Sequence, residues 1–133
     1  MRVISADWVV PVDGDPLPDG AVAIGDDGRI AAVGPAAELG PGERFDGAVI
    51  LPGFVNAHSH LEYAVYAGFG DGLPFAPWIS LHVRRKAKLE LEDMEAIARV
   101  GVAACLRSGV TTVGDASFAG AAATACAELG LRA

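Results

Sequence analysis

The chain has 133 residues, of which 52% are hydrophobic and 20% are charged. This length and composition are typical of a soluble globular domain. Seventeen acidic and ten basic side chains give a formal net charge of −7. Such a charge disfavours nonspecific binding to nucleic acid or to an anionic membrane, because both need a cationic surface. No run of about 18 or more apolar residues occurs, so we expect no membrane span.

The N-terminus lacks the long apolar core of a signal peptide, because Asp7 and Asp13 interrupt it. The only two cysteines, Cys105 and Cys126, lie in alanine-rich stretches that favour helices. A disulfide framework is therefore not expected, and free thiols in a reducing compartment fit better. These features predict a cytoplasmic protein without nucleic-acid or membrane partners.

Residues 1–50 predict short strands joined by tight turns. Val9-Val10 and residues 21–24 flank a turn-rich segment at 13–20. Residues 25–28, Gly-Asp-Asp-Gly, predict a hairpin, because Asp and Gly tolerate positive φ. Residues 30–33 would form the returning strand. No polar cluster here indicates chemistry, so we expect a small β-sheet module.

From residue 49 the pattern changes. An apolar run that includes Phe54 and Val55 follows a Pro-Gly turn, as expected of a strand buried on both faces in a parallel sheet. A glycine- and proline-rich connection extends over 68–77. A helix is predicted over about 91–108, with Gly109 as its C-cap.

A second strand is predicted at 110–113, followed by an alanine-rich helix at about 119–129. The order strand, helix, strand, helix is typical of parallel βα units. Residues 131–133 begin where a further strand would start. Two βα units cannot close a barrel, which usually takes about 250 residues. We therefore expect this chain to be the N-terminal portion of a larger protein.

One short basic cluster, Arg84-Arg85-Lys86 followed by Lys88, stands out in this acidic chain. Charge runs of this length are mostly solvated helix faces. We expect that role here, and we assign no anionic partner to the cluster.

His58 and His60 are the main candidates for chemistry. Residues i and i+2 of a strand point to the same side, with Cα atoms about 6.5 Å apart. Two imidazoles at that spacing can hold one zinc, iron, nickel or copper ion. The pair lies at the predicted carboxyl end of a parallel strand, the end that faces the active site in barrels. By spacing alone, two histidines two residues apart are more often a surface or hydrogen-bonded pair. A third histidine, His82, lies in a predicted helix or loop, where an ordinary polar role is expected.

Three segments together resemble those of the metal-dependent amidohydrolases. Residues 51–62, Leu-Pro-Gly-Phe-Val-Asn-Ala-His-Ser-His-Leu-Glu, are similar to the first barrel strand, with its Pro-Gly-(Phe/Leu/Met)-(Val/Ile)-(Asn/Asp)-x-His-x-His pattern. Residues 28–34 resemble the Gly-x-Ile-x-x-Val-Gly hairpin of their β-sandwich, and residues 108–115 resemble their second barrel strand. With residues 74–79, the His-Ser-His-Leu-Glu run is most similar to the branch of chlorohydrolases, methylthioadenosine/S-adenosylhomocysteine deaminases and aminofutalosine deaminases.

The resemblance implies an α/β fold with two parts. Residues 1–50 would be the N-terminal part of a small β-sandwich domain. Residues 51–133 would be the first two βα units of a (β/α)8 TIM-type barrel. Homologues of this kind are often dimers, so a homodimer is the candidate assembly.

The resemblance also implies a reaction. His58 and His60 would bind one divalent metal ion, zinc or iron, with a histidine and an aspartate from later strands. The metal-bound water would become a hydroxide that attacks a ring carbon of a small purine-like or other heterocyclic substrate. Ammonia would leave after protonation by an acid on a later strand. Residues 1–133 alone would then be inactive. The alternatives are cyclic-amide hydrolysis, dehalogenation, or a non-catalytic metal-binding module.

Three further side chains have two interpretations each. Glu62 would contact the substrate or support the residues that do so from behind, or it would be an exposed loop carboxylate. Trp78 would form a wall of the substrate pocket, or it would anchor its loop. Asp115 would line the pocket, or it would cap the turn or helix that follows.

Overall fold

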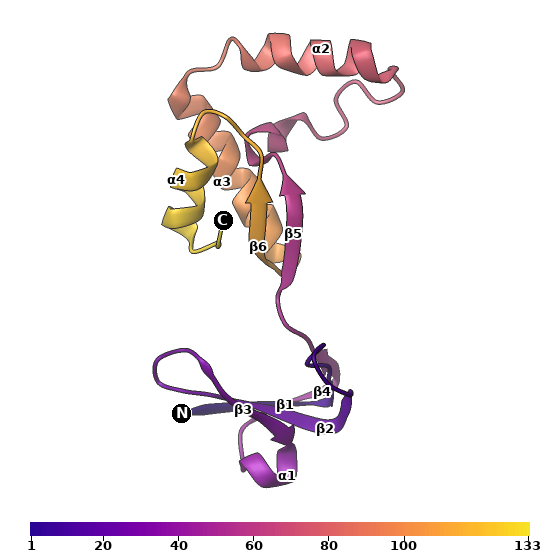
Figure 1. The fold of residues 1–133 in the computed structure, drawn as a ribbon, viewed down its shortest axis with the longest axis vertical. Coiled ribbons are helices and arrows are strands. Elements are labelled where there is room, and N and C mark those ends of the chain that lie inside the picture. Colours follow the sequence, from indigo (N-terminus) through magenta and orange to yellow (C-terminus); the bar gives the residue numbers. More distant parts are fainter. The chain divides into compact units, whose positions relative to one another are not determined.

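The computed structural model describes residues 1–133, which form two compact units, Met1–Pro52 and Gly53–Ala133. Figure 1 shows a small sheet with one short helix in the first unit, and two strands with longer helices in the second. No helix combines the length and the apolar composition that crossing a bilayer requires.

The first unit is a four-stranded sheet in the order β3-β2-β1-β4. Its strands are β1 (Arg2–Val9), β2 (Leu17–Ile24), β3 (Ile30–Pro35) and β4 (Glu43–Ile50), and a short helix α1 (Ala36–Leu39) follows β3. Strand β2 is antiparallel to β1 and to β3, whereas β4 is parallel to β1. The buried side chains Val3, Ala21 and Ala23 form its core.

The hairpin predicted at residues 25–28 is confirmed. The N–H of Gly25 donates to the carbonyl of Arg29 at 2.8 Å, and Gly28 has a φ of 77°, which glycine adopts without strain. The first strand is longer than the predicted Val9-Val10 and begins at Arg2. Strand β4 was not predicted, because most of its side chains are exposed and give no clear alternation.

The second unit is built on two parallel strands, β5 (Phe54–Ser59) and β6 (Val110–Asp115). Helix α3 (Leu91–Arg107) connects them, and α4 (Ala121–Leu129) follows β6, so the predicted strand-helix-strand-helix order is confirmed. Arg132 makes a parallel bridge with Thr112 of β6. This bridge lies where the sequence predicts the start of a further strand, and residues 131–133 form no named strand in the structure.

Helices α3 and α4 pack against each other and against η1 through small side chains, and α3 also contacts β6. Alanines of both helices allow close approach, and Gly101 of α3 lies so near Leu61 that an added Cβ would be 3.1 Å from its carbonyl oxygen. The core consists of Leu61, Ala98, Val102, Val113, Ala122, Ala125, Cys126 and Leu131. This packing fixes the carboxyl end of β6 and the residues that follow β5.

Both thiols are free, as expected. Cys126 is buried and Cys105 is half-buried against the same core. Burial raises the pKa of each thiol above its ordinary value, and the negative charge of Asp115 adds to the increase. The protonated, unreactive form is therefore favoured.

The segment between β5 and α3 differs from the prediction. The connection predicted over 68–77 is shorter, because α2 (Phe75–Lys86) begins at Phe75. Pro77 lies in the first turn of this helix, where a missing N–H breaks no helical hydrogen bond. The 3-10 helix η1 (Leu61–Tyr66) was not predicted either. In Figure 1, η1 and α2 lie beyond the arrowheads of β5 and β6.

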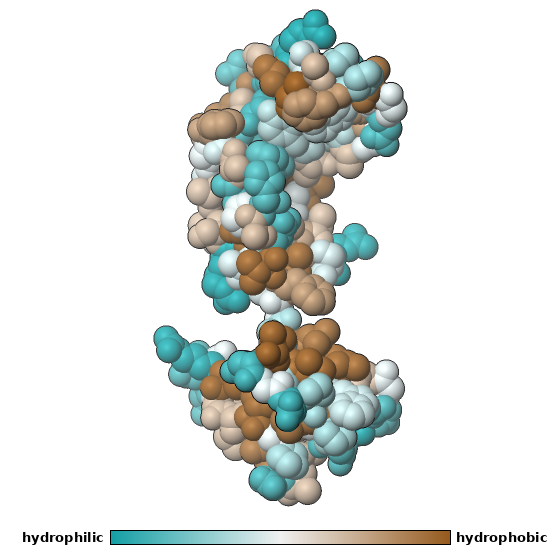
Figure 2. Space-filling view, turned by 45° about the vertical axis from the view of Figure 1, so that its right-hand side comes forward, coloured by the Kyte–Doolittle hydropathy of each residue, from teal (hydrophilic) through white to brown (hydrophobic).

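The prediction that strand β5 is buried on both faces is wrong. Phe54 is 55% exposed and Val55 is 67% exposed. The reason is that β5 pairs with β6 on one edge only, and the helices of the core pack over β6. Figure 2 shows hydrophobic residues on the surface of this unit and of the first one.

Gly114 of β6 gives a direct test of this strand pairing. A Cβ added there would lie 2.8 Å from the carbonyl oxygen of Ala57 in β5. We expect Gly114→Ala to lower the free energy of unfolding by about 1–3 kcal/mol, because backbone atoms must shift to make room. Urea denaturation measures the change. Gly34→Ala is the matched strand-glycine control, since no atom lies within 4 Å of its added Cβ. Equal stability of both variants would contradict the close approach.

Candidate metal centre

The two histidines lie side by side at the carboxyl end of β5. Their Nε2 atoms are 3.1 Å apart, and the ring centroids are 4.9 Å apart at an interplanar angle of 86°. Both residues are exposed. In this arrangement one Nε2–H donates to the other Nε2, and either ring can be the donor. Once that proton is removed, the two converging nitrogens would direct both lone pairs near one point.

The spacing of these nitrogens fits a shared metal ion. Zinc–nitrogen bonds are about 2.0–2.1 Å long, so two nitrogens of one tetrahedral site lie about 3.3 Å apart. The observed separation of 3.1 Å is close to this value. Metal binding would replace the proton between the rings, since only neutral imidazole with a free Nε2 lone pair is a ligand. Within residues 1–133, no third His, Cys, Asp or Glu joins the pair in a metal-binding group.

The backbone around the pair is held by local hydrogen bonds. The side-chain oxygen of Asn56 accepts from the N–H of His58 at 3.3 Å. The N–H of Tyr63 donates to the carbonyl of His60 at 2.9 Å, and the Tyr63 ring meets the His60 ring edge-on, with centroids 5.9 Å apart. Helix η1 therefore begins directly on the second histidine.

Asp115 joins the ends of the two strands. One carboxylate oxygen accepts from the N–H of Leu61 at 2.7 Å, and the other accepts from the N–H of Ser117 at 2.9 Å. Asp115 is also paired with Ser59 in the ladder between β5 and β6. Of its two interpretations, the geometry matches capping, because both oxygens are bonded to backbone.

Glu62 is a buried residue rather than an exposed loop carboxylate. Its side chain is 0% exposed, and Oε2 accepts a hydrogen bond from Nζ of Lys86 in α2. Its second oxygen, Oε1, is buried without a hydrogen-bond partner. Lys86 itself is only 13% exposed. It therefore does not lie on the solvated helix face that was predicted for the basic cluster.

Trp78 lies against His82 rather than against the histidine pair. The two ring centroids are 4.5 Å apart, and the Nε2 of His82 is 3.1 Å from the carbonyl oxygen of Phe69. His82 is 2% exposed and is also flanked by the ring of Tyr66. These contacts anchor α2 to the connection that precedes it, so the structure does not bring His82 to the pair.

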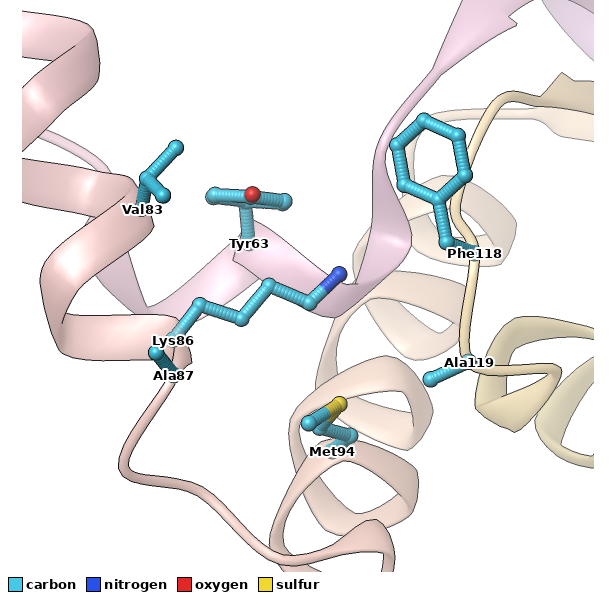
Figure 3. A pocket seen from close by; sticks show the side chains of 7 residues that line it. All are labelled: Tyr63, Val83, Lys86, Ala87, Met94, Phe118 and Ala119. Carbon is cyan, nitrogen blue, oxygen red and sulfur yellow. The ribbon is translucent and has the colours of Figure 1, made fainter.

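A mostly apolar pocket of about 450 Å³, open to solvent and called the cavity below, lies next to this region. Figure 3 shows it between α2, η1, the start of α3 and the loop after β6. Its lining residues are Tyr63, Val83, Lys86, Ala87, Met94, Phe118 and Ala119. Tyr63 thus touches both the cavity and the His60 ring.

Sequence reasoning missed Tyr63 and Lys86. Tyr63 follows the motif by three residues, and its position in η1 was not predicted. Lys86 is the last residue of α2, and its role depends on reaching Glu62 across 24 residues of sequence. The one available indication was that the basic cluster occurs in a strongly acidic chain.

Comparison with known proteins identifies the family of the chain that carries this strand-end pair. Residues 49–133 match the model of the amidohydrolase family. The chain belongs to this family. The α/β architecture predicted from its motifs is confirmed by solved structures, which it resembles in their N-terminal parts.

Among curated relatives, the chain is 37% identical to a 5-methylthioadenosine/S-adenosylhomocysteine deaminase of Moorella thermoacetica. The match covers 94% of this chain and 31% of that protein. It is 31% identical to a 5'-deoxyadenosine deaminase of Methanococcoides burtonii, over 87% of this chain and 28% of that protein. The chain therefore spans about a third of the length of these amidohydrolase relatives.

Among solved structures, an adenosine deaminase from Xanthomonas campestris with bound zinc has a TM-score of 0.80 and 29% identity. The match covers 98% of this chain and 32% of that one. Helicobacter pylori aminofutalosine deaminase in complex with methylthio-coformycin has a TM-score of 0.77 and 24% identity, covering 96% and 33%. The second likeness concerns the amidohydrolase fold alone.

The capping role of Asp115 can be measured by substitution. Asp115→Ala leaves the N–H groups of Leu61 and Ser117 without their acceptor, so we expect the free energy of unfolding to fall by about 1–3 kcal/mol. Asp115→Asn keeps one carbonyl acceptor and should lose less. Chemical denaturation measures both. Asp71→Ala, at an exposed aspartate, is the control. An Asp115→Ala protein as stable as the control variant would exclude the capping role.

Proposed function

We propose that this chain carries half of the metal site of an amidohydrolase that acts on non-peptide C–N bonds. The substrate would be a small purine-like or other heterocyclic molecule, and the reaction its deamination. The observation that carries this proposal is the convergence of the Nε2 atoms of His58 and His60 at a parallel strand end. The curated relatives named as adenosine-type deaminases support the substrate class.

We propose the same division of the chain that the family resemblance implies. Residues 1–50 are part of a β-sandwich domain, and residues 51–133 are the first two βα units of a TIM-type barrel. The parallel β5–β6 pair and the further parallel bridge at Arg132 support the second assignment. Such features are expected at the start of a barrel sheet, in which every connection between strands passes through a helix.

His58 and His60 would hold one divalent metal ion, for which we propose zinc over iron. The zinc in the related Xanthomonas campestris deaminase supports this choice. When bound, such an ion makes water acidic enough to act as a nucleophile near neutral pH. The remaining ligands and the proton donor would come from other residues of the complete protein, because a catalytic zinc takes at least three protein ligands.

The residues around the pair would shape the place where the substrate lies. The neighbouring cavity of about 450 Å³ is within the range of small-molecule sites, about 300–1,000 Å³. We propose that Tyr63, Met94 and Phe118 give this cavity apolar walls for the part of the substrate that does not react. Glu62 and Trp78 would act behind these walls, since Glu62 is buried and Trp78 packs on His82.

We further propose a cytoplasmic location, which the two free thiols favour. Assembly as a homodimer stays a prediction. Its measurement is the mass of the complete protein in solution.

The metal assignment is tested by substituting each histidine in the complete protein. We expect His58→Ala and His60→Ala each to lose bound zinc, because the remaining imidazole and the other ligands together bind the ion too weakly. Metal content after dialysis is the measurement. His82→Phe is the matched control: it removes a histidine and fills the buried aromatic site it occupied. Wild-type zinc content in both alanine variants would disprove the ligand roles.

The reaction is tested by release of ammonia from candidate substrates. We expect the complete protein loaded with zinc to deaminate at least one of methylthioadenosine, S-adenosylhomocysteine and 5'-deoxyadenosine, the compounds in the names of its relatives. Removal of the metal with a chelator should abolish the activity, and zinc should restore it. Release of chloride from a chlorotriazine without any deamination would support dehalogenation instead.

A further inference from the structure

Helix α2 contacts the start of η1 through one buried ion pair. Nζ of Lys86, in the last turn of α2, donates to Oε2 of Glu62, the second residue of η1. The two side chains are 13% and 0% exposed. A buried pair of this kind is costly to break from one side, because the partner is left as an uncompensated charge. Because Glu62 lies two residues after His60, the ion pair constrains the backbone that follows this histidine.

The ammonium group of Lys86 also contacts Tyr63, whose ring touches His60 of the histidine pair. Nζ of Lys86 lies 4.7 Å from the centroid of the Tyr63 ring, within the range of a cation–π contact. The Tyr63 ring in turn meets the His60 ring edge-on, and the backbone N–H of Tyr63 donates to the His60 carbonyl. Figure 3 shows Lys86 extending past Tyr63 along the cavity.

The opposite side of the same turn is fixed by a different group. Asp115 of β6 accepts from the N–H of Leu61, the first residue of η1. Each of the first three residues after His60 thus has a partner: Asp115 holds Leu61, and Lys86 holds Glu62 and Tyr63. The other two charged side chains of α2 have different partners: Arg84 donates to the carbonyl of Ser80, and Arg85 lies over the Phe69 ring.

We propose that Lys86 is a positioning residue for His60, acting through Glu62 and Tyr63. It fixes the turn that starts at the histidine and the ring that packs against its imidazole, so that the His60 Nε2 stays directed at the His58 Nε2. This inference rests on the proposed metal site and adds to it a residue remote in sequence. Groups that orient a metal ligand typically contribute 10–100-fold to metal affinity.

The test measures zinc affinity of the complete protein by competition with a chelating dye, next to its thermal unfolding without metal. We expect Lys86→Met to weaken zinc binding about tenfold, because the stem remains while the charge and both contacts of Nζ are lost. Lys86→Arg, which keeps the charge, should restore most of the affinity. Lys88→Met is the matched control, two residues further on at an exposed position.

A second variant separates positioning from folding. Tyr63→Leu leaves the Glu62–Lys86 pair in place and removes the ring between Lys86 and His60, so zinc affinity should also fall. If Lys86→Met does not fold, this variant decides alone. Wild-type zinc affinity in the folded variants, with only the metal-free stability lowered, would overturn the proposal. If His58→Ala and His60→Ala lose zinc while the folded Lys86 and Tyr63 variants keep wild-type affinity, the positioning role is disproved and the proposed metal site still holds.

Discussion

The parallel pairing of β5 with β6 is the constraint on which the candidate site depends. It places the carboxyl ends of two strands, separated by the whole of α2 and α3, next to each other. Asp115 can then bond the backbone that follows His60. Without this pairing the histidines would be two exposed side chains on a free segment. With it, their ring nitrogens have a defined separation and a defined surrounding.

The parts of the structure that were predicted from sequence are those with a local cause. The hairpin at residues 25–28 depends on two glycines and their neighbours, and helices α3 and α4 depend on alanine-rich spacing and the glycines that end them. The likeness of the strand motif to amidohydrolases predicted the family, because several ordered residues must coincide for such a match. These features need no knowledge of distant contacts.

The parts that were missed depend on distant contacts. Lys86 belongs to a run of basic residues whose ordinary place is a solvated helix face, and only its distance from Glu62 in the folded chain distinguishes it. Phe54 and Val55 have the composition of a buried strand, yet their exposure is set by which neighbours cover them. Helix η1 forms where Asp115, from another strand, caps its first residue.

The attachment of α2 has a consequence for how enzymes of this kind diversify. The connection that leads into α2 contains three glycines with positive φ, Gly68, Gly70 and Gly72. The helix itself is held by contacts of the side chains of His82, Arg85 and Lys86. Insertions in that connection would shift α2 and reshape one wall of the cavity, and Lys86 would carry the shift to Glu62, two residues after His60. Under the proposed function, a change in the wall formed by α2 would therefore also act on metal binding unless the Lys86–Glu62 pair is kept, and an engineer who reshapes this wall would have to preserve that pair.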